Sequence, residues 1–73
     1  MIRYISVGED LHSEELGEYH SYGICAVDDN NEEMAFISDV ATDEKTVTHI
    51  AKLCTDGQLD PQQLKDVVLN FLE

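Results

Sequence analysis

Short runs of β-branched and aromatic residues alternate with polar turns in the first half of the chain. Three such runs, at residues 2–7, 19–27 and 34–38, predict β-strands, with Val40 as an extension of the third. Residues 9–18 hold five acids and no base, and their two leucines set up no sustained period. We therefore predict a loop there, in which the glycine closes a turn in the left-handed conformation.

The second and third predicted strands are joined by a polar turn at residues 28–33. Two asparagines at its centre tolerate the positive φ that a tight hairpin requires. A turn centred on them places Cys25 opposite Phe36. Ile24 then lies opposite Ile37, and the glycine before Ile24 predicts a bulge or a close backbone approach.

Both faces of this predicted hairpin are apolar. One face carries Cys25, Val27, Met34 and Phe36, and the other carries Tyr22, Ile24, Ala26, Ala35 and Ile37. Helices can cover one side of a small sheet, so the second face is a candidate contact surface. The two tyrosines of the second strand fall on opposite faces, and at least one is expected to be an exposed anchor. The candidate interface residues are Tyr19, Tyr22, Ile24 and Phe36.

The second half of the chain has helical periodicity. Thr42 or Asp43 caps a first helix that runs to about Asp56, and Gly57 ends it. The buried stripe of this helix comprises Val47, Ile50, Ala51 and Cys54. The short connection that follows predicts that the next helix packs against it as an antiparallel hairpin.

The last helix is predicted over residues 59–72. Asp60 is its N-cap, Pro61 takes the first helical position, and Gln63 completes a capping box. Its apolar stripe comprises Leu64, Val67, Val68, Phe71 and Leu72. The fold class is therefore α+β, a single domain over residues 1–73. In it a three-stranded antiparallel β-meander packs against a C-terminal antiparallel helical hairpin, in the order β-β-β-α-α.

The charge balance narrows the classes of partner. Sixteen Asp and Glu against four Lys and Arg give a formal net charge of −12. Four scattered cations cannot neutralise nucleic-acid phosphates or an anionic membrane, so neither is expected as a direct partner. The chain begins with no basic leader and has no long apolar run, which predicts a cytoplasmic protein.

No motif indicates catalysis. The histidines, His12, His20 and His49, lack the spacing of a zinc site, and the two cysteines sit apart in apolar patterns. The 28–39 segment echoes a calcium loop, but Glu33 stands where such a loop requires its turn glycine. We predict no catalytic, cofactor-binding or metal-binding residue, and no enzyme activity.

Two segments resemble a known family. The pattern Y-x-x-Y-G-I at residues 19–24 and the helix end L-x-D-V-V-x-x-F-L at residues 64–72 are similar to a family of short, acidic, uncharacterised bacterial proteins. That family, of unknown function, occurs mainly in Firmicutes of clostridial type. The resemblance implies an origin and a one-domain architecture, and it transfers no functional residue.

The expected function is that of a small, non-catalytic interaction or regulatory module. Its partner would be another protein, or a second copy bound through the uncovered sheet face beside the acidic 9–18 segment. One alternative is an acidic decoy that occupies the basic surface of a nucleic-acid-binding protein. Another is a small ligand-binding dimer that uses Tyr19, His20 or His49.

Overall fold

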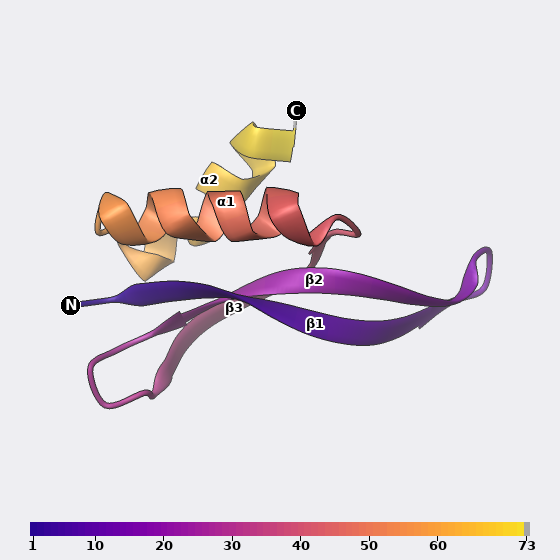
Figure 1. The fold of residues 1–73 in the computed structure, drawn as a ribbon, viewed down its shortest axis with the longest axis horizontal. Helices are drawn as coiled ribbons and strands as arrows, with labels where there is room; N and C mark the ends of the chain where they lie inside the picture. Colours follow the sequence, from indigo (N-terminus) through magenta and orange to yellow (C-terminus); the bar gives the residue numbers. More distant parts are fainter. Residues whose placement is uncertain (73) are drawn as a thin grey trace.

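The computed structural model describes residues 1–72 and shows three strands followed by two helices (Figure 1). The elements are β1 (Arg3–Ser13), β2 (Gly17–Val27), β3 (Glu33–Ala41), α1 (Glu44–Asp56), the 3₁₀ turn η1 (Pro61–Gln63) and α2 (Leu64–Leu72). The strands form one antiparallel sheet in the order β1-β2-β3. This architecture confirms the predicted α+β fold.

The predicted loop over residues 9–18 is wrong, because β1 and β2 continue through it as a long hairpin. Their register is unbroken from Arg3 opposite Val27 to Ser13 opposite Gly17. Acidic residues are poor strand formers by themselves, but pairing with a neighbouring strand overrides this weak preference. Gly17 has the predicted positive φ of +70°, at a hairpin turn. We call residues 9–18 the distal hairpin, because it extends beyond the helices (Figure 1).

The pairing of β2 with β3 follows the predicted register. Cys25 lies opposite Phe36 and Ile24 opposite Ile37. Asn31 supplies the positive φ of the turn, at 62°. Beyond Ile24 the register shifts at Gly23, as the position of that glycine predicted.

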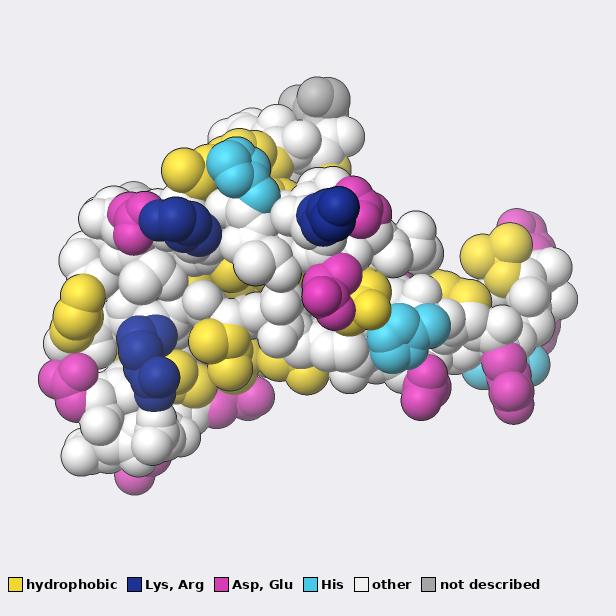
Figure 2. All heavy atoms as spheres, in the orientation of Figure 1, with side chains coloured by type: hydrophobic (Ala, Val, Ile, Leu, Met, Phe, Trp, Pro, Cys, Tyr) yellow, Lys and Arg dark blue, Asp and Glu magenta, His cyan; other side chains and the backbone are white. Residues whose placement is uncertain are grey.

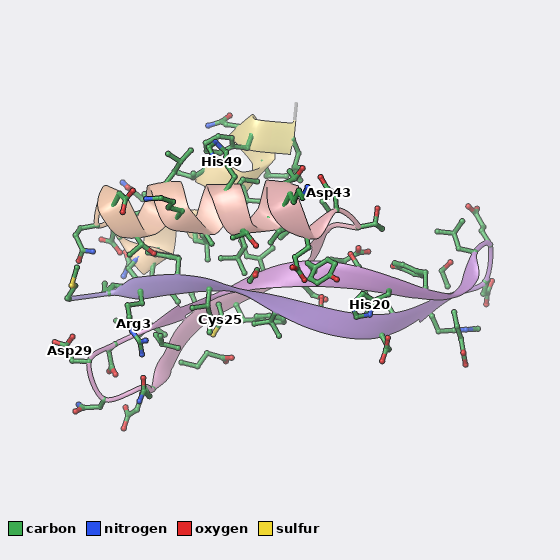
Figure 3. All side chains as sticks on the ribbon, in the orientation of Figure 1. Arg3, His20, Cys25, Asp29, Asp43 and His49 are labelled. Atoms are coloured by element: carbon green, nitrogen blue, oxygen red, sulfur yellow. The ribbon has the colours of Figure 1, made fainter. Side chains whose placement is uncertain are left out.

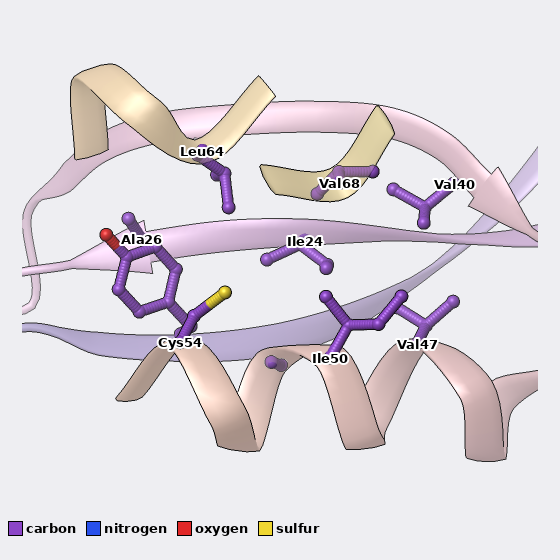
Figure 4. Packing of buried hydrophobic residues seen from close by; sticks show 10 residues of the cluster. Ile24, Ala26, Val40, Val47, Ile50, Cys54, Leu64 and Val68 are labelled. Carbon is purple, nitrogen blue, oxygen red and sulfur yellow. The ribbon is translucent and has the colours of Figure 1, made fainter. Parts of the chain in front are cut away.

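Both helices cover the same face of the sheet. The core lies between the helices and the sheet (Figure 4). It is built from Ile24 and Ala26 of β2, with Tyr4, Val40, Val47, Ile50, Ala51, Cys54, Leu64 and Val68. Ile24 is fully buried, so its candidate role as an interface residue is wrong: it faces the helices, and no partner can reach it. The predicted stripe of α2 is buried only in part, since Phe71 and Leu72 are about half exposed where α2 rises from the sheet (Figure 1).

Capping side chains fix where the helices begin. The Asp43 carboxylate accepts the N–H of Lys45, and that of Asp60 accepts the N–H of Gln62 at 2.9 Å. The last helix starts with a 3₁₀ turn, in which the N–H of Gln63 donates to the carbonyl of Asp60. This contact takes the place of the predicted capping box, in which the Gln63 side chain would have reached back.

The end of α1 is tied to the start of β1 by side chains. The Thr55 hydroxyl accepts the N–H of Tyr4 at 2.8 Å, and the Gln58 amide binds both backbone groups of Ile2 at 3.1 Å. The Tyr4 hydroxyl donates to the carbonyl of Leu59. These bonds satisfy backbone groups that an edge strand would otherwise leave open.

Candidate interaction surface

The face of the sheet opposite the helices carries an apolar row across all three strands. Ile5 lies opposite Cys25, and Cys25 lies opposite Phe36. Ile5, Met34 and Phe36 are 43%, 50% and 41% exposed. Cys25 is buried beneath its neighbours and points away from the helices (Figure 3). We call this surface the open face; its apolar members are Ile5, Val7, Cys25, Val27, Met34 and Phe36.

The centre of the open face depends on Gly23. A Cβ at this position would lie 2.5 Å from the carbonyl oxygen of Ile37 and 3.0 Å from the ring of Phe36. The missing side chain therefore lets β3 approach closely, and the Phe36 ring lies over the gap. This packing holds Phe36 on the surface of the sheet.

A bulge in β3 brings a polar cluster to the edge of the open face. Tyr22 pairs with Ala41 and Ile24 with Ile37, so that β3 has Ser38, Asp39 and Val40 where β2 has only Gly23. Asp39 takes a positive φ of 54° there. Asp and Asn tolerate this conformation better than most residues do. Val40 is consequently buried in the core while the Asp39 carboxylate faces outward.

Hydrogen bonds from three strands converge on two carboxylates at the bulge. Asp39 accepts the hydroxyls of Tyr19 at 2.7 Å and Ser21 at 2.6 Å. Glu9 accepts the hydroxyl of Ser38 and the N–H of Asp39, both at 2.8 Å. We call Glu9, Tyr19, Ser21, Ser38 and Asp39 the bulge network. It anchors two carboxylates beside an apolar surface.

These contacts shift the pKa values of Asp39 and Tyr19. The hydroxyls of Ser21 and Tyr19 stabilise the ionised carboxylate, which lowers the pKa of Asp39 below its ordinary value. The same bond raises the pKa of Tyr19, because the phenol donates to a carboxylate. The Asp39 carboxylate is therefore ionised near neutral pH.

The predicted interface residues do not form one surface. Tyr19 and Phe36 lie on the open face, where Phe36 is exposed and Tyr19 is half-buried with its hydroxyl bound to Asp39. Tyr22 lies on the helix side, half-buried, and its ring meets that of His20 edge-on at 4.9 Å. Burial raises the pKa of Tyr22, and the nearby Glu44 carboxylate raises it further. The apolar row also includes Ile5, which could have been found from its alternation with Tyr4 in the first strand.

The bulge network could not be found from the sequence. Glu9 fell in a predicted loop, and Asp39 followed the predicted third strand. Their meeting requires β1 to continue past Gly8 and β3 to bulge, and neither event has a local signal.

The histidines are spread over separate surfaces. His20 lies just past the distal hairpin and contacts Asp10 of that hairpin at 2.9 Å. The pair lies beside a shallow hollow of about 450 Å³ lined by Asp10, Leu11, His12, Glu18, Tyr19 and His20. His49 is exposed on α1 near α2, away from that hollow (Figure 3). Within residues 1–72, no group of three or more His, Cys, Asp or Glu side chains is arranged to hold a metal ion.

The two cysteines are free and buried, and burial raises the pKa of both thiols. Cys54 packs in the core and Cys25 under the open face. A thiol with a raised pKa is mostly protonated at neutral pH, so neither side chain has the character of a nucleophile.

Charge is distributed unevenly along the chain. Twelve of the sixteen acids lie between Glu9 and Glu44, a stretch that contains no Lys or Arg. The ion pairs among the described residues include that of the N-terminal amine with Asp29 at 3.0 Å and that of Lys52 with Asp56 at 2.8 Å. The strands therefore present a strongly acidic surface around the apolar row. Among residues 1–72, no helix combines the length and apolar character needed to cross a membrane.

The fold and surface together define a small acidic α+β protein in which helices cover one sheet face and leave the other open. The chain belongs to a family of unknown function, DUF6514, whose model matches residues 1–73. No curated protein and no solved structure matches it.

Proposed function

We propose that this protein is a small, non-catalytic interaction module that binds another protein through the open face. The observation that carries the proposal is the exposure of Ile5, Met34 and Phe36 on a sheet face that nothing within residues 1–72 covers. Contiguous apolar surface of this kind marks interaction sites on soluble proteins. Aromatic side chains such as Phe36 are frequent anchors of such contacts.

Charge favours a particular kind of partner. The Glu9 and Asp39 carboxylates are anchored by hydrogen bonds beside the apolar row, and Glu32 and Glu33 are exposed at its other end. A surface with apolar side chains flanked by Lys or Arg complements this arrangement. A second copy docked face to face would instead bring like carboxylates together. We therefore favour a different, basic protein, in the cytoplasm of a bacterium of clostridial type.

A charge placed in the apolar row tests the proposal. Tagged wild-type protein, Phe36→Lys and Gln62→Lys would be used to purify partners from native lysate at low and high salt. Gln62 is exposed on the helix side, so its variant adds the same charge away from the open face. We expect one protein to be retained by wild type and Gln62→Lys, to persist at high salt, and to be lost with Phe36→Lys.

Other outcomes would contradict this function. Retention of the same partners by a folded Phe36→Lys variant would show that the open face is not the binding surface. Circular dichroism of each variant establishes that it is folded. If the Phe36→Lys variant forms a smaller assembly than the wild type, the result would indicate self-association through this face.

A second candidate is the acidic decoy, which the distal hairpin favours. Asp10, Glu14, Glu15 and Glu18 are exposed there with no cation between Tyr4 and Glu44. A nucleic-acid-binding protein captured by this surface would be released by high salt, because exposed charges are screened within about 10 Å at 0.1 M ionic strength. It would be retained by Phe36→Lys, which separates the two functions.

A further inference from the structure

The backbone groups on the outer edge of β1 have hydrogen-bond partners only at the start of the strand. Both backbone groups of Tyr4 bond to the Thr55 hydroxyl, at 2.8 and 3.3 Å, and so point away from β2. The pairing of β1 with β2 is unbroken over its whole length. Alternate residues of a paired antiparallel strand turn their backbone groups to the same side. The groups that point outward with those of Tyr4 are therefore those of Ser6, Gly8, Asp10 and His12.

These four residues form an open edge. Within residues 1–72, no side chain or strand bonds to their outward N–H and C=O groups. Proteins usually protect such an edge with a proline, a lysine or a bulge. The segment from Ser6 to His12 has none of these, and its charged side chains, Glu9 and Asp10, are bound to β3 and to His20. It is a template for one more antiparallel strand.

The two halves of β1 differ in charge. Lys52 is four residues after Thr48, which contacts Ser6 at 3.2 Å, and three before Thr55. Residues at these spacings share one side of a helix, so Lys52 faces the same edge of the sheet. Figure 2 shows basic and acidic side chains next to one another over α1 and the start of β1, and acidic ones without basic neighbours along the distal hairpin. The start of the β1 edge therefore carries charges of both signs, since Lys52 is paired with Asp56 at 2.8 Å and the N-terminal amine with Asp29 at 3.0 Å, whereas the distal hairpin is acidic only.

We propose that two copies of this chain pair through the open edges of β1, antiparallel, with Gly8 at the two-fold axis. The second copy reverses the direction of β1, so each acidic distal hairpin lies along the end of the other β1 that holds Arg3 and lies beside Lys52. Ser6 of each copy then faces Asp10 of the other. The central pair of Gly8 residues and the two pairs of Ser6 with Asp10 allow roughly six backbone hydrogen bonds between the copies.

The charges along β1 and the hydrogen bonds that already cap its start determine the register of this pairing. Pairing centred on Glu9 would set two carboxylates directly opposite each other, which is destabilising. Pairing centred on Val7 would use the backbone groups of Tyr4, which Thr55 already binds. Pairing centred on Gly8 avoids the contact between like carboxylates and confines the bonded pairs to residues 6–10, so that Tyr4 and the His12 opposite it lie beyond them. On the open face it places Ile5 beside Leu11 of the second copy.

The bonded residues 6–10 of this arrangement overlap α1 only at Ser6. Thr55 contacts β1 at Tyr4 and Thr48 contacts it at Ser6, so that α1 covers only the first half of the strand. The distal hairpin lies outside that cover (Figure 1). Antiparallel pairing therefore displaces the two α1 helices toward opposite ends of a six-stranded sheet.

Cysteine cross-linking tests both the pairing and its register. In Gly8→Cys the two new residues would face each other with Cα atoms about 5.5 Å apart, within the range of a disulfide. The new Cβ would lie 3.3 Å from the imidazole of His20, an exposed side chain that can move. We expect rapid covalent dimer formation under mild oxidation.

The matched control is Ser6→Cys, in which the two new residues would be roughly 13 Å apart along the strands. We expect no disulfide in this variant, nor in the parent chain, whose cysteines are buried. Equal cross-linking of Ser6→Cys and Gly8→Cys would overturn the proposed register. Failure of Gly8→Cys to cross-link would overturn the pairing.

Sedimentation equilibrium tests the assembly without a covalent bond. Gly8→Pro removes an outward N–H without removing a hydrogen bond between β1 and β2, whereas Gly8→Ala adds a Cβ and keeps the N–H. We expect a dissociation constant about tenfold or more higher for Gly8→Pro and one near wild type for Gly8→Ala. A wild-type monomer at every concentration would refute the proposal. Phe36→Lys should still form the dimer, so this result is independent of the proposed function.

Discussion

Gly23 shows how one missing side chain shapes a surface. Its place could be predicted from the sequence, because glycine inside a strand run indicates a bulge or close approach. The nature of the irregularity could not be predicted, since the extra residues lie in β3 and not beside the glycine. The bulge turns Asp39 outward and Val40 inward, which an alternation pattern alone would not assign correctly.

We expect Gly23→Ala to destabilise the fold by about 1–3 kcal/mol, in the range of overpacking substitutions. The added methyl group would lie 2.5 Å from the backbone oxygen of Ile37, so β3 must shift. Gly57→Ala is the matched control, because its Cβ would meet its nearest neighbour at 3.4 Å and its φ is −85°. Urea unfolding followed by circular dichroism measures both; equal stability of the two variants would contradict this account.

At the level of elements, β1 and α1 depend on each other. The Thr55 hydroxyl binds both backbone groups of Tyr4 and also donates to the carbonyl of Ala51. Strand and helix were predicted separately, and the caps Asp43 and Asp60 were recognised because their signals are local. The bond between Thr55 and Tyr4 spans 51 residues and has no signal in either segment.

We expect Thr55→Val to lower the free energy of unfolding by about 1–3 kcal/mol, the cost of leaving a part-buried polar group without its partner. Valine keeps the size of the side chain and removes only the hydroxyl. Thr48→Val is the control, since its hydroxyl meets only that of Ser6 at 3.2 Å at an exposed site; we expect a loss below about 0.5 kcal/mol. Thermal and urea unfolding of both variants give the comparison, and similar losses would refute the special role of Thr55.

The distal hairpin is the largest element that sequence reasoning missed. Its residues are mostly acidic, and the pairs that stabilise it, such as Asp10 with His20, form only across the strands. Propensity within either segment favours a loop. Pairing between the segments decides the structure, and a single segment contains no information about its partner.

At the scale of the whole molecule, acid pH has two opposing effects. Protonation of the carboxylates reduces the self-repulsion of a chain with net charge −12, which favours the compact state. It also removes the ionised Asp39 that holds β2 and β3 together at the bulge. The lowered pKa of Asp39 means that this contribution is complete above its ordinary pKa of about 4 and is lost as pH falls through the lowered value.

We therefore expect Asp39→Asn to be less stable than wild type at neutral pH, with a difference that shrinks as pH falls below about 4. Asparagine tolerates the positive φ at this position, so the comparison isolates the carboxylate. Asp66→Asn, at an exposed site on α2, is the control for the general change in charge. Urea unfolding between acid and neutral pH measures the difference. A difference independent of pH would contradict the assignment.

The bulge in β3 also bears on how far the sheet can grow. A dimer formed through β1 would leave β3 as the edge at each end, and a regular edge there could recruit further copies into a fibre. At Asp39 the backbone has a positive φ, and its N–H is already bound to Glu9, so this edge is neither straight nor unoccupied. The irregularity that positions a carboxylate on the surface would thus also end the assembly at two copies, which is a protection against aggregation.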